Sequence, residues 1–269
     1  MTALQRMIDF YDRRMIGRNQ RRYYEDSGFF NFGYWDPPTN SQRHASEALV
    51  DRLIERMPAY AGRILDVACG LGASTRRLMD RYPPGAITGI NISYKQLAEA
   101  RKRAPGCTFL QMDAARLAFP DDQFDAVICV EAAFHFDTRD AFLREALRVL
   151  KPGGSLVLSD IFFRAFVTRW AERTQIPRAN FVPDITSYAR RLKEAGFEAV
   201  DVRDRTDQCL GGFRSNIVRW PAAEHRRGRM SLRTNLAGAV LCRGIAAYVG
   251  AACKTYVLVS ACKPAARRP

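Results

Sequence analysis

The sequence predicts a doubly wound α/β domain, and three observations lead to that prediction. Short apolar runs recur at residues 64–68, 87–93, 107–111, 124–130 and 155–160, as buried parallel strands require. Segments with apolar residues at helical spacing lie between them, near residues 73–82, 93–103 and 139–150. The first run also ends in a turn containing Gly70 and Gly72 and continues as a helix. Alternating strands and helices imply right-handed crossovers in a parallel sheet.

The length and composition favour one domain with additions. The chain has 269 residues, of which 47% are hydrophobic and 26% charged. No apolar run of eighteen residues is evident, and Arg6, Arg13 and Arg14 interrupt any signal-peptide core at the N-terminus. Seven cysteines form no C-x-x-C pair and show no metal-ligand spacing with the three histidines. We therefore expect a cytoplasmic protein without a membrane span or a metal.

The net charge of +14 is concentrated in one part of the chain. Residues 161–269 carry 20 basic and 8 acidic side chains, whereas the two signs nearly balance before residue 161. Such an excess can attract nucleic acid, an acidic carrier protein, a membrane surface or an acidic small molecule. The alternative is a solvated face rich in arginine.

The segments outside the central alternation have recognisable patterns. Residues 2–22 carry a helical apolar stripe, residues 23–35 contain seven aromatic side chains, and a second helix begins at Ser41 and ends before Pro58. Towards the C-terminus we expect a helix at 184–195, a sixth strand at 198–204, an arginine-rich segment at 205–235, a helix at 236–249, a seventh strand at 255–261 and a disordered tail at 267–269.

The turn after the first strand indicates a ligand site. Asp66 stands near the carboxyl end of that strand, and glycines at 70 and 72 let a ligand approach the backbone. Asn91 ends the second strand, where ribose hydroxyls are held in doubly wound folds, and the third strand ends in Met112-Asp113-Ala114. The G-x-G-x-x-G pattern of dinucleotide dehydrogenases does not fit this turn.

The series from Asp66 to the segment Glu145-Ala-Leu-Arg-Val-Leu-Lys-Pro-Gly-Gly154 resembles class I S-adenosylmethionine-dependent methyltransferases, in their sterol, tocopherol and polyketide-tailoring branch. The resemblance implies a Rossmann-like seven-stranded sheet whose last strand is antiparallel. It also implies a helical and aromatic cap at 1–60, a methyltransferase domain at 61–269 and lid segments near 162–183 and 205–250. The expected cofactor-binding residues are Asp66, Ala68, Cys69, Gly70, Gly72, Asn91, Ile92, Gln96, Asp113, Ala114 and Val130.

Two positions depart from the family pattern. Ala68 replaces the first glycine of the usual motif, a change that the loop can absorb. Asn91 replaces the ribose-binding acid, which exchanges a charged hydrogen bond of about 1.5–3 kcal/mol for a neutral one of about 0.5–1.5 kcal/mol.

Glu131 and His135 follow the fourth strand four residues apart, so on a helical turn they would share one face. Histidine is a natural base for a phenol, enol or alcohol, which favours O-methylation. Two alternatives stay open: C-methylation of a prenyl or polyketide acceptor, with Glu131 stabilising a carbocation or accepting a proton, and a nonmethylating enzyme such as a cyclase. An RNA methyltransferase is not favoured, because the Asn/Asp-Pro-Pro-aromatic motif is missing after the fourth strand.

We expect a small-molecule acceptor, with an anionic group attracted by the arginines of 205–233. The sequence leaves the oligomeric state open. The expected pocket-lining aromatic residues are Tyr24, Phe30, Tyr34, Trp35, Phe134, Phe162 and Phe166.

Overall fold

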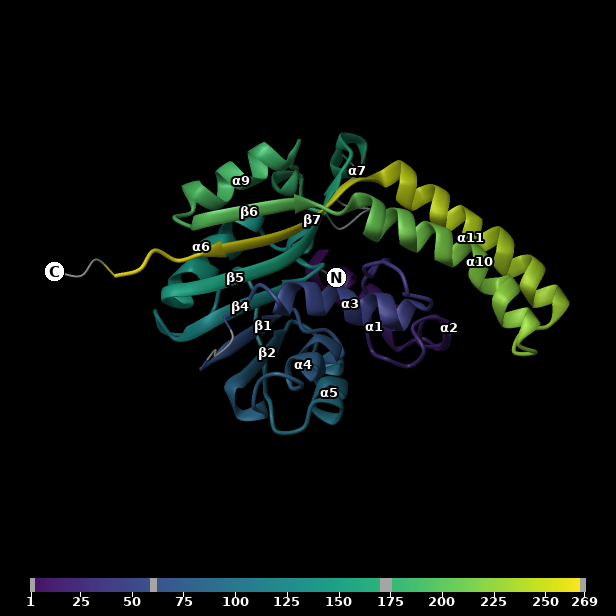
Figure 1. The fold of residues 1–269 in the computed structure, drawn as a ribbon, viewed down its shortest axis with the longest axis horizontal. Helices are drawn as coiled ribbons and strands as arrows, with labels where there is room; N and C mark the ends of the chain where they lie inside the picture. Colours follow the sequence, from purple (N-terminus) through teal and green to yellow (C-terminus); the bar gives the residue numbers. More distant parts are fainter. Residues whose placement is uncertain (1–2, 59–61, 170–175, 267–269) are drawn as a thin grey trace.

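The computed structural model describes residues 3–58, 62–169 and 176–266 and is built on a seven-stranded sheet (Figure 1). The strand order is β3-β2-β1-β4-β5-β7-β6. Strands β1 to β5 pair in parallel, and β7 is antiparallel to both β5 and β6. This confirms the predicted doubly wound fold. The strands are β1 (Ile64–Val67), β2 (Ile87–Asn91), β3 (Thr108–Gln111), β4 (Phe124–Val130), β5 (Leu150–Phe163), β6 (Glu198–Asp204) and β7 (Cys253–Cys262).

The strand order reverses at β1, which lies between β2 and β4. Asp66 in β1 pairs with Gly89 in β2 and with Ile128 in β4, so the three strands end at nearly the same level. In open α/β sheets such a reversal creates a crevice at the carboxyl ends of the strands. The fold therefore positions a ligand site above β1.

Side-chain caps explain where several of the helices begin. Ser41, Ser93, Thr138 and Asp184 each accept a hydrogen bond from a backbone N–H in the first turn of the helix that follows. These helices are α3 (Gln42–Ile54), α5 (Tyr94–Arg103), α6 (Arg139–Val149) and α9 (Ile185–Glu194), and α4 (Ala73–Leu78) begins directly after the glycine-rich turn. Short 3₁₀ turns occur at Pro84–Ala86 (η1), Ala133–His135 (η2) and Arg178–Asn180 (η3).

Both faces of the sheet are covered, which explains the apolar character of its strands. On one face Ile64 packs in a cluster with Leu49 and Leu53 of α3. On the other face the next residue, Leu65, packs in a cluster with Phe142 of α6 and the helix α9. Helix α3, from the expected N-terminal cap, thus shares a core with the sheet.

The N-terminal segment forms two helices, α1 (Ala3–Ile16) and α2 (Arg18–Tyr23), followed by an irregular stretch up to Ser41. The α1 helix agrees with the apolar stripe predicted from sequence. In the segment expected to form a lid, near 162–183, the short helix α7 (Ala165–Arg169) follows β5. Residues 170–175 of this segment lie outside the described part of the chain. The tail at 267–269 is likewise outside it.

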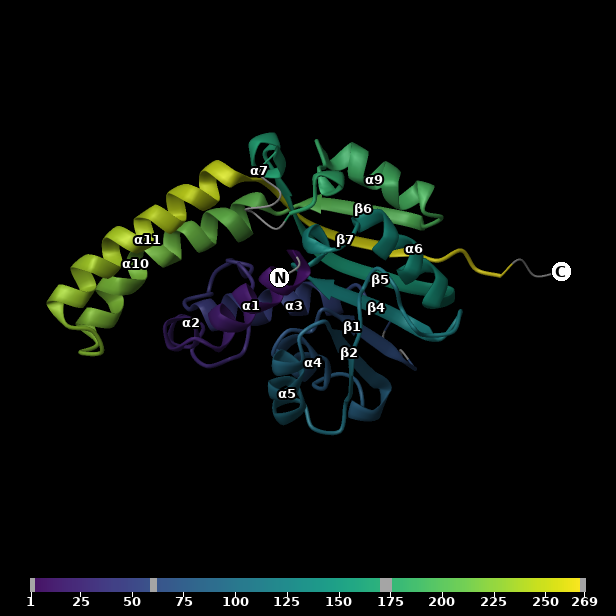
Figure 2. The ribbon, with the colours of Figure 1, turned by 180° about the vertical axis from the view of Figure 1, so that it is seen from behind.

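A long helical hairpin was predicted in part: the helix expected at 236–249 is present as the longer α11 (Leu232–Ala252), whereas its partner in the arginine-rich segment was not predicted. The arginine-rich segment begins with a π-turn at Asp207–Gly211 (η4) and continues as α10 (Gly212–Arg226), which pairs with α11. Figures 1 and 2 show that the hairpin extends away from the sheet, at the end opposite to the C-terminus.

By length and composition alone, α11 is apolar enough to cross a membrane, and 22% of its most apolar window is buried. This corrects the expectation that no such apolar stretch exists. The small residues and two arginines between its leucines made the stretch inconspicuous in the sequence.

Candidate functional site

A cavity of about 680 Å³ lies at the carboxyl ends of β1, β2 and β4, beneath α1. Its floor comes from the sheet and from the turns that follow the strands, and its roof comes from α1 and from residues 28–31. Nine of the eleven expected cofactor residues line it, together with both expected catalytic residues: Ala68, Cys69, Gly70, Asn91, Ile92, Gln96, Asp113, Ala114, Val130, Glu131 and His135. The exceptions are Asp66 and Gly72.

The glycine-rich turn needs left-handed backbone at three positions. The φ angles are +57° at Ala68, +55° at Gly70 and +80° at Gly72. Gly70 faces the cavity, whereas a Cβ at Gly72 would come within 2.8 Å of the Ala100 Cα. Gly72 does not line the cavity, and its lack of a side chain allows α4 and α5 to pack closely. Ala68 adopts a conformation that L-residues disfavour, which explains why a glycine is usual there.

Asp66 lies beneath the turn and is 1% exposed. Its Oδ2 accepts hydrogen bonds from the hydroxyls of Ser74 (2.8 Å) and Thr75 (2.7 Å), while its Oδ1 is buried without a partner among the described residues. Burial raises the pKa of Asp66 to about 6, although the two hydroxyl bonds oppose the shift. An unpartnered buried carboxylate oxygen is costly unless a ligand donates to it, so Asp66 suits a cationic or N–H group bound in the turn.

Asn91 belongs to a hydrogen-bonded group that includes a carboxylate from α1. Its side chain donates to Gln96 Oε1 (3.1 Å) and accepts from the Ser93 amide (2.9 Å). Ser93 Oγ and Gln96 Nε2 both donate to Asp12 Oδ1, at 2.6 and 2.8 Å. Asp12 is 5% exposed. Asp12 does not line the cavity, but it holds α1 against the residues that surround Asn91.

The far end of the cavity is formed by Met112, Asp113 and Ala114 after β3. Asp113 Oδ1 accepts from the Ala115 amide (2.9 Å), which fixes the loop in a tight turn. Met112 N donates to Asn91 O (3.0 Å), so the ends of β2 and β3 are held together. A flat, partly polar group fits between this loop and Ile92.

Glu131 ties three segments together at the cavity wall. Its Oε1 accepts from the Phe32 amide (2.8 Å) and from the Tyr256 hydroxyl (2.5 Å). Burial raises the pKa of Glu131 to about 8, although both hydrogen bonds oppose the shift. The carboxyl therefore carries a proton at neutral pH. Its backbone is left-handed, with φ +49°, so the expected helical turn from 131 to 135 does not form.

His135 forms a pair with Tyr11 of α1. The Tyr11 hydroxyl lies 2.5 Å from His135 Nε2, and the two rings meet edge to face with centroids 5.1 Å apart. Burial raises the pKa of Tyr11, so its hydroxyl keeps its proton and donates to the imidazole. Both side chains line the cavity. The sequence identified His135 but gave no sign of its partner.

Among the seven expected pocket aromatics, Phe30 alone lines this cavity. Phe162 is fully buried on the far side of the sheet against Tyr188, Phe134 packs on Phe163, and Phe166 is 48% exposed outside it. The other three hold the irregular segment in place: the Tyr24 hydroxyl donates to Asn31 O, the Tyr34 amide to Ala45 O, and Trp35 Nε1 to Phe32 O. These six side chains therefore lie outside the lining of this cavity.

Several cavity residues were not anticipated from the sequence. Six of them come from α1, whose Leu4, Met7, Ile8, Tyr11 and Met15 form a largely apolar roof beside Arg6. The apolar stripe of this helix was visible, but what it covers is decided by tertiary packing. None of the arginines between 205 and 233 lines the cavity in the described part of the chain, so an anionic acceptor stays a prediction.

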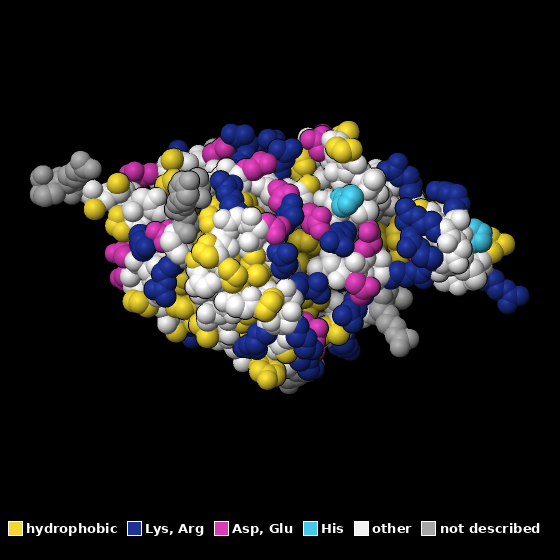
Figure 3. Space-filling model, turned by 60° about the horizontal axis from the view of Figure 1, so that its bottom comes forward, with side chains coloured by type: hydrophobic (Ala, Val, Ile, Leu, Met, Phe, Trp, Pro, Cys, Tyr) yellow, Lys and Arg dark blue, Asp and Glu magenta, His cyan; other side chains and the backbone are white. Residues whose placement is uncertain are grey.

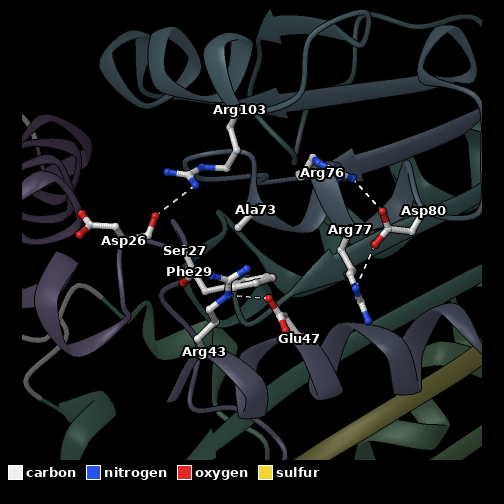
Figure 4. A pocket seen from close by; sticks show the side chains of 10 residues that line it. All are labelled: Asp26, Ser27, Phe29, Arg43, Glu47, Ala73, Arg76, Arg77, Asp80 and Arg103. Carbon is white, nitrogen blue, oxygen red and sulfur yellow. Dashed lines mark hydrogen bonds and ion pairs between the residues drawn. The ribbon is translucent and has the colours of Figure 1, made fainter. Parts of the chain in front are cut away.

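A smaller cavity of about 240 Å³ lies behind the turn, between α3, α4 and α5 (Figure 4). Arg76 and Arg77 both donate to Asp80, Arg43 donates to Glu47, and Arg103 donates to the backbone oxygen of Asp26. These interactions stabilise the packing of the helices.

The described residues contain neither a disulfide nor a cluster of side chains that could bind a metal. All seven cysteines are free, and burial raises the pKa of Cys69, the one in the turn, well above its usual value. Within residues 3–58, 62–169 and 176–266, no three His, Cys, Asp or Glu side chains come together as a metal site would require.

The residues of the main cavity fit S-adenosylmethionine. The bare backbone at Gly70 and the side chain of Asn91 line it along the strand ends, where the methionine and ribose parts of the cofactor would lie, and the unpartnered oxygen of Asp66 is buried beneath the same turn. The seven-stranded sheet and this site together define an S-adenosylmethionine-dependent methyltransferase.

Comparisons with known proteins agree. The chain belongs to the methyltransferase family: residues 65–158 match the family model described as a methyltransferase domain. The methyltransferase GfsG of Streptomyces halstedii is 30% identical over 74% of this chain and 75% of its own length. The 27-O-demethylrifamycin SV methyltransferase of Amycolatopsis mediterranei is 35% identical over 64% of this chain and 67% of its own length.

Solved structures share the fold. The [4+2]-cyclase SpnF is 27% identical and has a TM-score of 0.66, with 88% of each chain covered. Geranyl diphosphate C-methyltransferase from Streptomyces coelicolor has a TM-score of 0.67 at 15% identity, with 90% of this chain and 91% of that chain covered. The latter likeness is one of fold alone.

Proposed function

We propose that this methyltransferase methylates a hydroxyl group of a small natural product, of the polyketide type, with Tyr11 and His135 removing the proton. The observation that carries the proposal is the 2.5 Å contact between the Tyr11 hydroxyl and His135 Nε2 in the cavity wall. The rifamycin relative, whose name gives an O-demethylated molecule as its acceptor, supports the choice of acceptor atom.

When bound, S-adenosylmethionine supplies a methyl group on a positively charged sulfur. The chain holds the reactants in line, excludes water and accepts one proton. An acceptor hydroxyl beside Tyr11 passes its proton to the phenol oxygen as the phenol proton moves to His135 Nε2. The oxygen of the acceptor gains the methyl group, and His135 ends as imidazolium. In this arrangement Tyr11 relays the proton, and His135 is the base.

The apolar roof contributed by α1 determines what kind of acceptor enters. Leu4, Met7, Ile8 and Met15 line the cavity together with Phe30, which suits a hydrophobic molecule with few polar groups. The same side chains keep water away from the reacting atoms. The free cysteines agree with a cytoplasmic location.

Glu131 gives a reason to keep C-methylation as the second candidate. A carboxylate beside the reacting centre could stabilise a carbocation or remove a proton from carbon. Burial holds the pKa of Glu131 at about 8, however, and its Oε1 already binds Phe32 and Tyr256. At neutral pH this side chain is therefore a neutral anchor for the cap rather than an anion.

Methyl-labelled S-adenosylmethionine tests the proposal. The protein is incubated with the labelled cofactor and a panel of macrolide, ansamycin and aromatic polyketide alcohols, and product carbons are assigned by NMR. We expect the label on oxygen. A label on carbon would establish the Glu131 alternative, and a rearranged acceptor without label would indicate a cyclase activity.

A further inference from the structure

Helix α11 presents an unpartnered apolar face on the outside of the hairpin. Leu232, Leu236, Val240, Leu241 and Tyr248 are between 59% and 73% exposed, and they make up nearly half of the exposed large hydrophobic side chains in the described part of the chain. Soluble monomers rarely expose so many large apolar side chains along one element.

The exposed side chains share one half of the helix surface. Leu232, Leu236 and Val240 follow each other at four-residue spacing, and the rest of that half is made up of small residues together with the exposed Arg233 and Arg243. The opposite half packs on α10: Cys242, Ala246 and Val249 are buried there, and Arg214 of α10 donates to Ala246 O (2.9 Å). A helix of 21 residues is about 30 Å long, so the exposed apolar face extends over a considerable length.

The hairpin is strongly basic. Residues 212–252 include seven arginines and a single acid, Glu224. That acid is buried and already paired with Arg22, Arg227 and Arg229. Helix α11 itself has exposed arginines at 233 and 243 and no acid. In Figure 3, where the hairpin forms the right-hand end, dark-blue basic side chains gather over that end, while acidic ones lie closer to the body.

We propose that the outer face of α11 binds to the surface of an anionic phospholipid bilayer. Exposed apolar side chains with arginines among them suit the membrane interface, because the apolar groups reach the acyl chains while the long arginine side chains extend to the phosphates. A second copy of the chain suits the face less well, because it would bring together two hairpins of the same positive sign.

The helix lies on the bilayer rather than across it. Its C-terminal end continues directly into β7, in the middle of the sheet, and its partner α10 carries Arg214, Arg219 and Arg226 along its length. A membrane span would have to carry these charges through the hydrocarbon layer.

Docking would also bring the active site close to the lipid. Tyr248, at the C-terminal part of the exposed face, lies near Tyr11 and Arg14 of α1, since each pair interacts electrostatically. The same helix α1 forms the roof of the cavity and exposes Leu4 and Phe10. A hydrophobic acceptor dissolved in the bilayer would then have a short path to the cavity.

Vesicle flotation with the full chain tests the proposal without any acceptor. Vesicles of phosphatidylcholine mixed with phosphatidylglycerol are compared with vesicles of phosphatidylcholine alone. We expect wild type to float with the anionic vesicles only. Leu236→Ser with Val240→Ser should lower the partition coefficient at least about tenfold, because two deeply inserted apolar side chains are lost. Arg233→Ala with Arg243→Ala should lower it by about fivefold for each arginine.

Tyr94→Ser is the matched control, because Tyr94 is 67% exposed on α5, away from the hairpin, and its loss should leave flotation unchanged. Exposed positions were chosen so that the variants fold. Wild type that fails to float with anionic vesicles overturns the proposal. So does a wild-type dimer in light scattering that Leu236→Ser with Val240→Ser converts to monomer, because a second copy then covers the face.

Discussion

Replacing Glu131 by Gln should change how the free energy of unfolding depends on pH. The carboxyl is buried, and burial raises its pKa from 4.5 to about 8. Between these values the folded protein holds a proton that the unfolded chain has released. Rising pH therefore favours the unfolded chain, and stability is lost as pH rises from about 4.5 to about 8. The glutamine of the Glu131→Gln variant would not titrate, and its amide oxygen can accept the same bonds from Phe32 and Tyr256.

The size of this change in the free energy of unfolding follows from the pKa shift of Glu131. One pKa unit corresponds to about 1.4 kcal/mol, so the shift sets a ceiling of about 5 kcal/mol. We expect about 2–4 kcal/mol, because water entering an open cavity relieves part of the burial. The free energy of unfolding of Glu131→Gln, minus that of wild type, should rise by this amount between about pH 5 and about pH 8.5.

Urea unfolding followed by circular dichroism measures both proteins across this range. Glu145→Gln is the control: Arg148 lowers the pKa of Glu145, so that side chain titrates below the range and its difference from wild type should stay constant. If the free energies of unfolding of wild type and Glu131→Gln depend on pH in the same way, the pKa of Glu131 is not raised, and the side chain is ionised throughout this range.

Three further changes test other parts of the structure. Asp12→Ala should weaken binding of S-adenosylhomocysteine by about tenfold in calorimetry, because Ser93 and Gln96 lose their charged acceptor; unchanged affinity would remove Asp12 from the site. Ala68→Gly should raise the free energy of unfolding by about 0.5–1 kcal/mol, since the left-handed backbone suits glycine; a lower melting temperature would contradict this. Arg139→Met should cost about 3–5 kcal/mol by leaving the buried Asp160 unpaired, and adding Asp160→Asn should restore much of it; no recovery in urea unfolding would show that the ion pair is not the cause.

The sequence predicted those parts of the fold that depend on local patterns. The strands were found from apolar runs, and helix starts such as Ser41 and Asp184 from their capping side chains, which act on the adjacent turn. The helix expected at 236–249 was confirmed as α11, but α10 was missed because Pro221 and many arginines obscure its helical pattern. The helix α10 is stabilised by packing against α11, and such packing between two segments cannot be predicted from the sequence of either one alone.

The sequence predicted those site residues that lie in the glycine-rich turn or at the ends of the strands. The turn from Ala68 to Gly70 and the ends of β2 and β4 reach the cavity because strand order brings them together. Asp12 and Tyr11 could not be assigned, since only the tertiary position of α1 brings them to Asn91 and His135. The aromatic residues failed as markers because an apolar ring looks the same in sequence whether it packs in the core or lines a pocket.

In the proposed mechanism, the Tyr11–His135 pair accepts the proton of the acceptor during methyl transfer. The single-turnover rate of His135→Gln, with the acceptor found in the labelling panel, tests it most directly. We expect the rate to fall by about 10²–10⁴-fold while calorimetry shows unchanged affinity for S-adenosylhomocysteine, and Tyr11→Phe should lower the rate as well. A His135→Gln enzyme that transfers the methyl group at the wild-type rate would contradict the account.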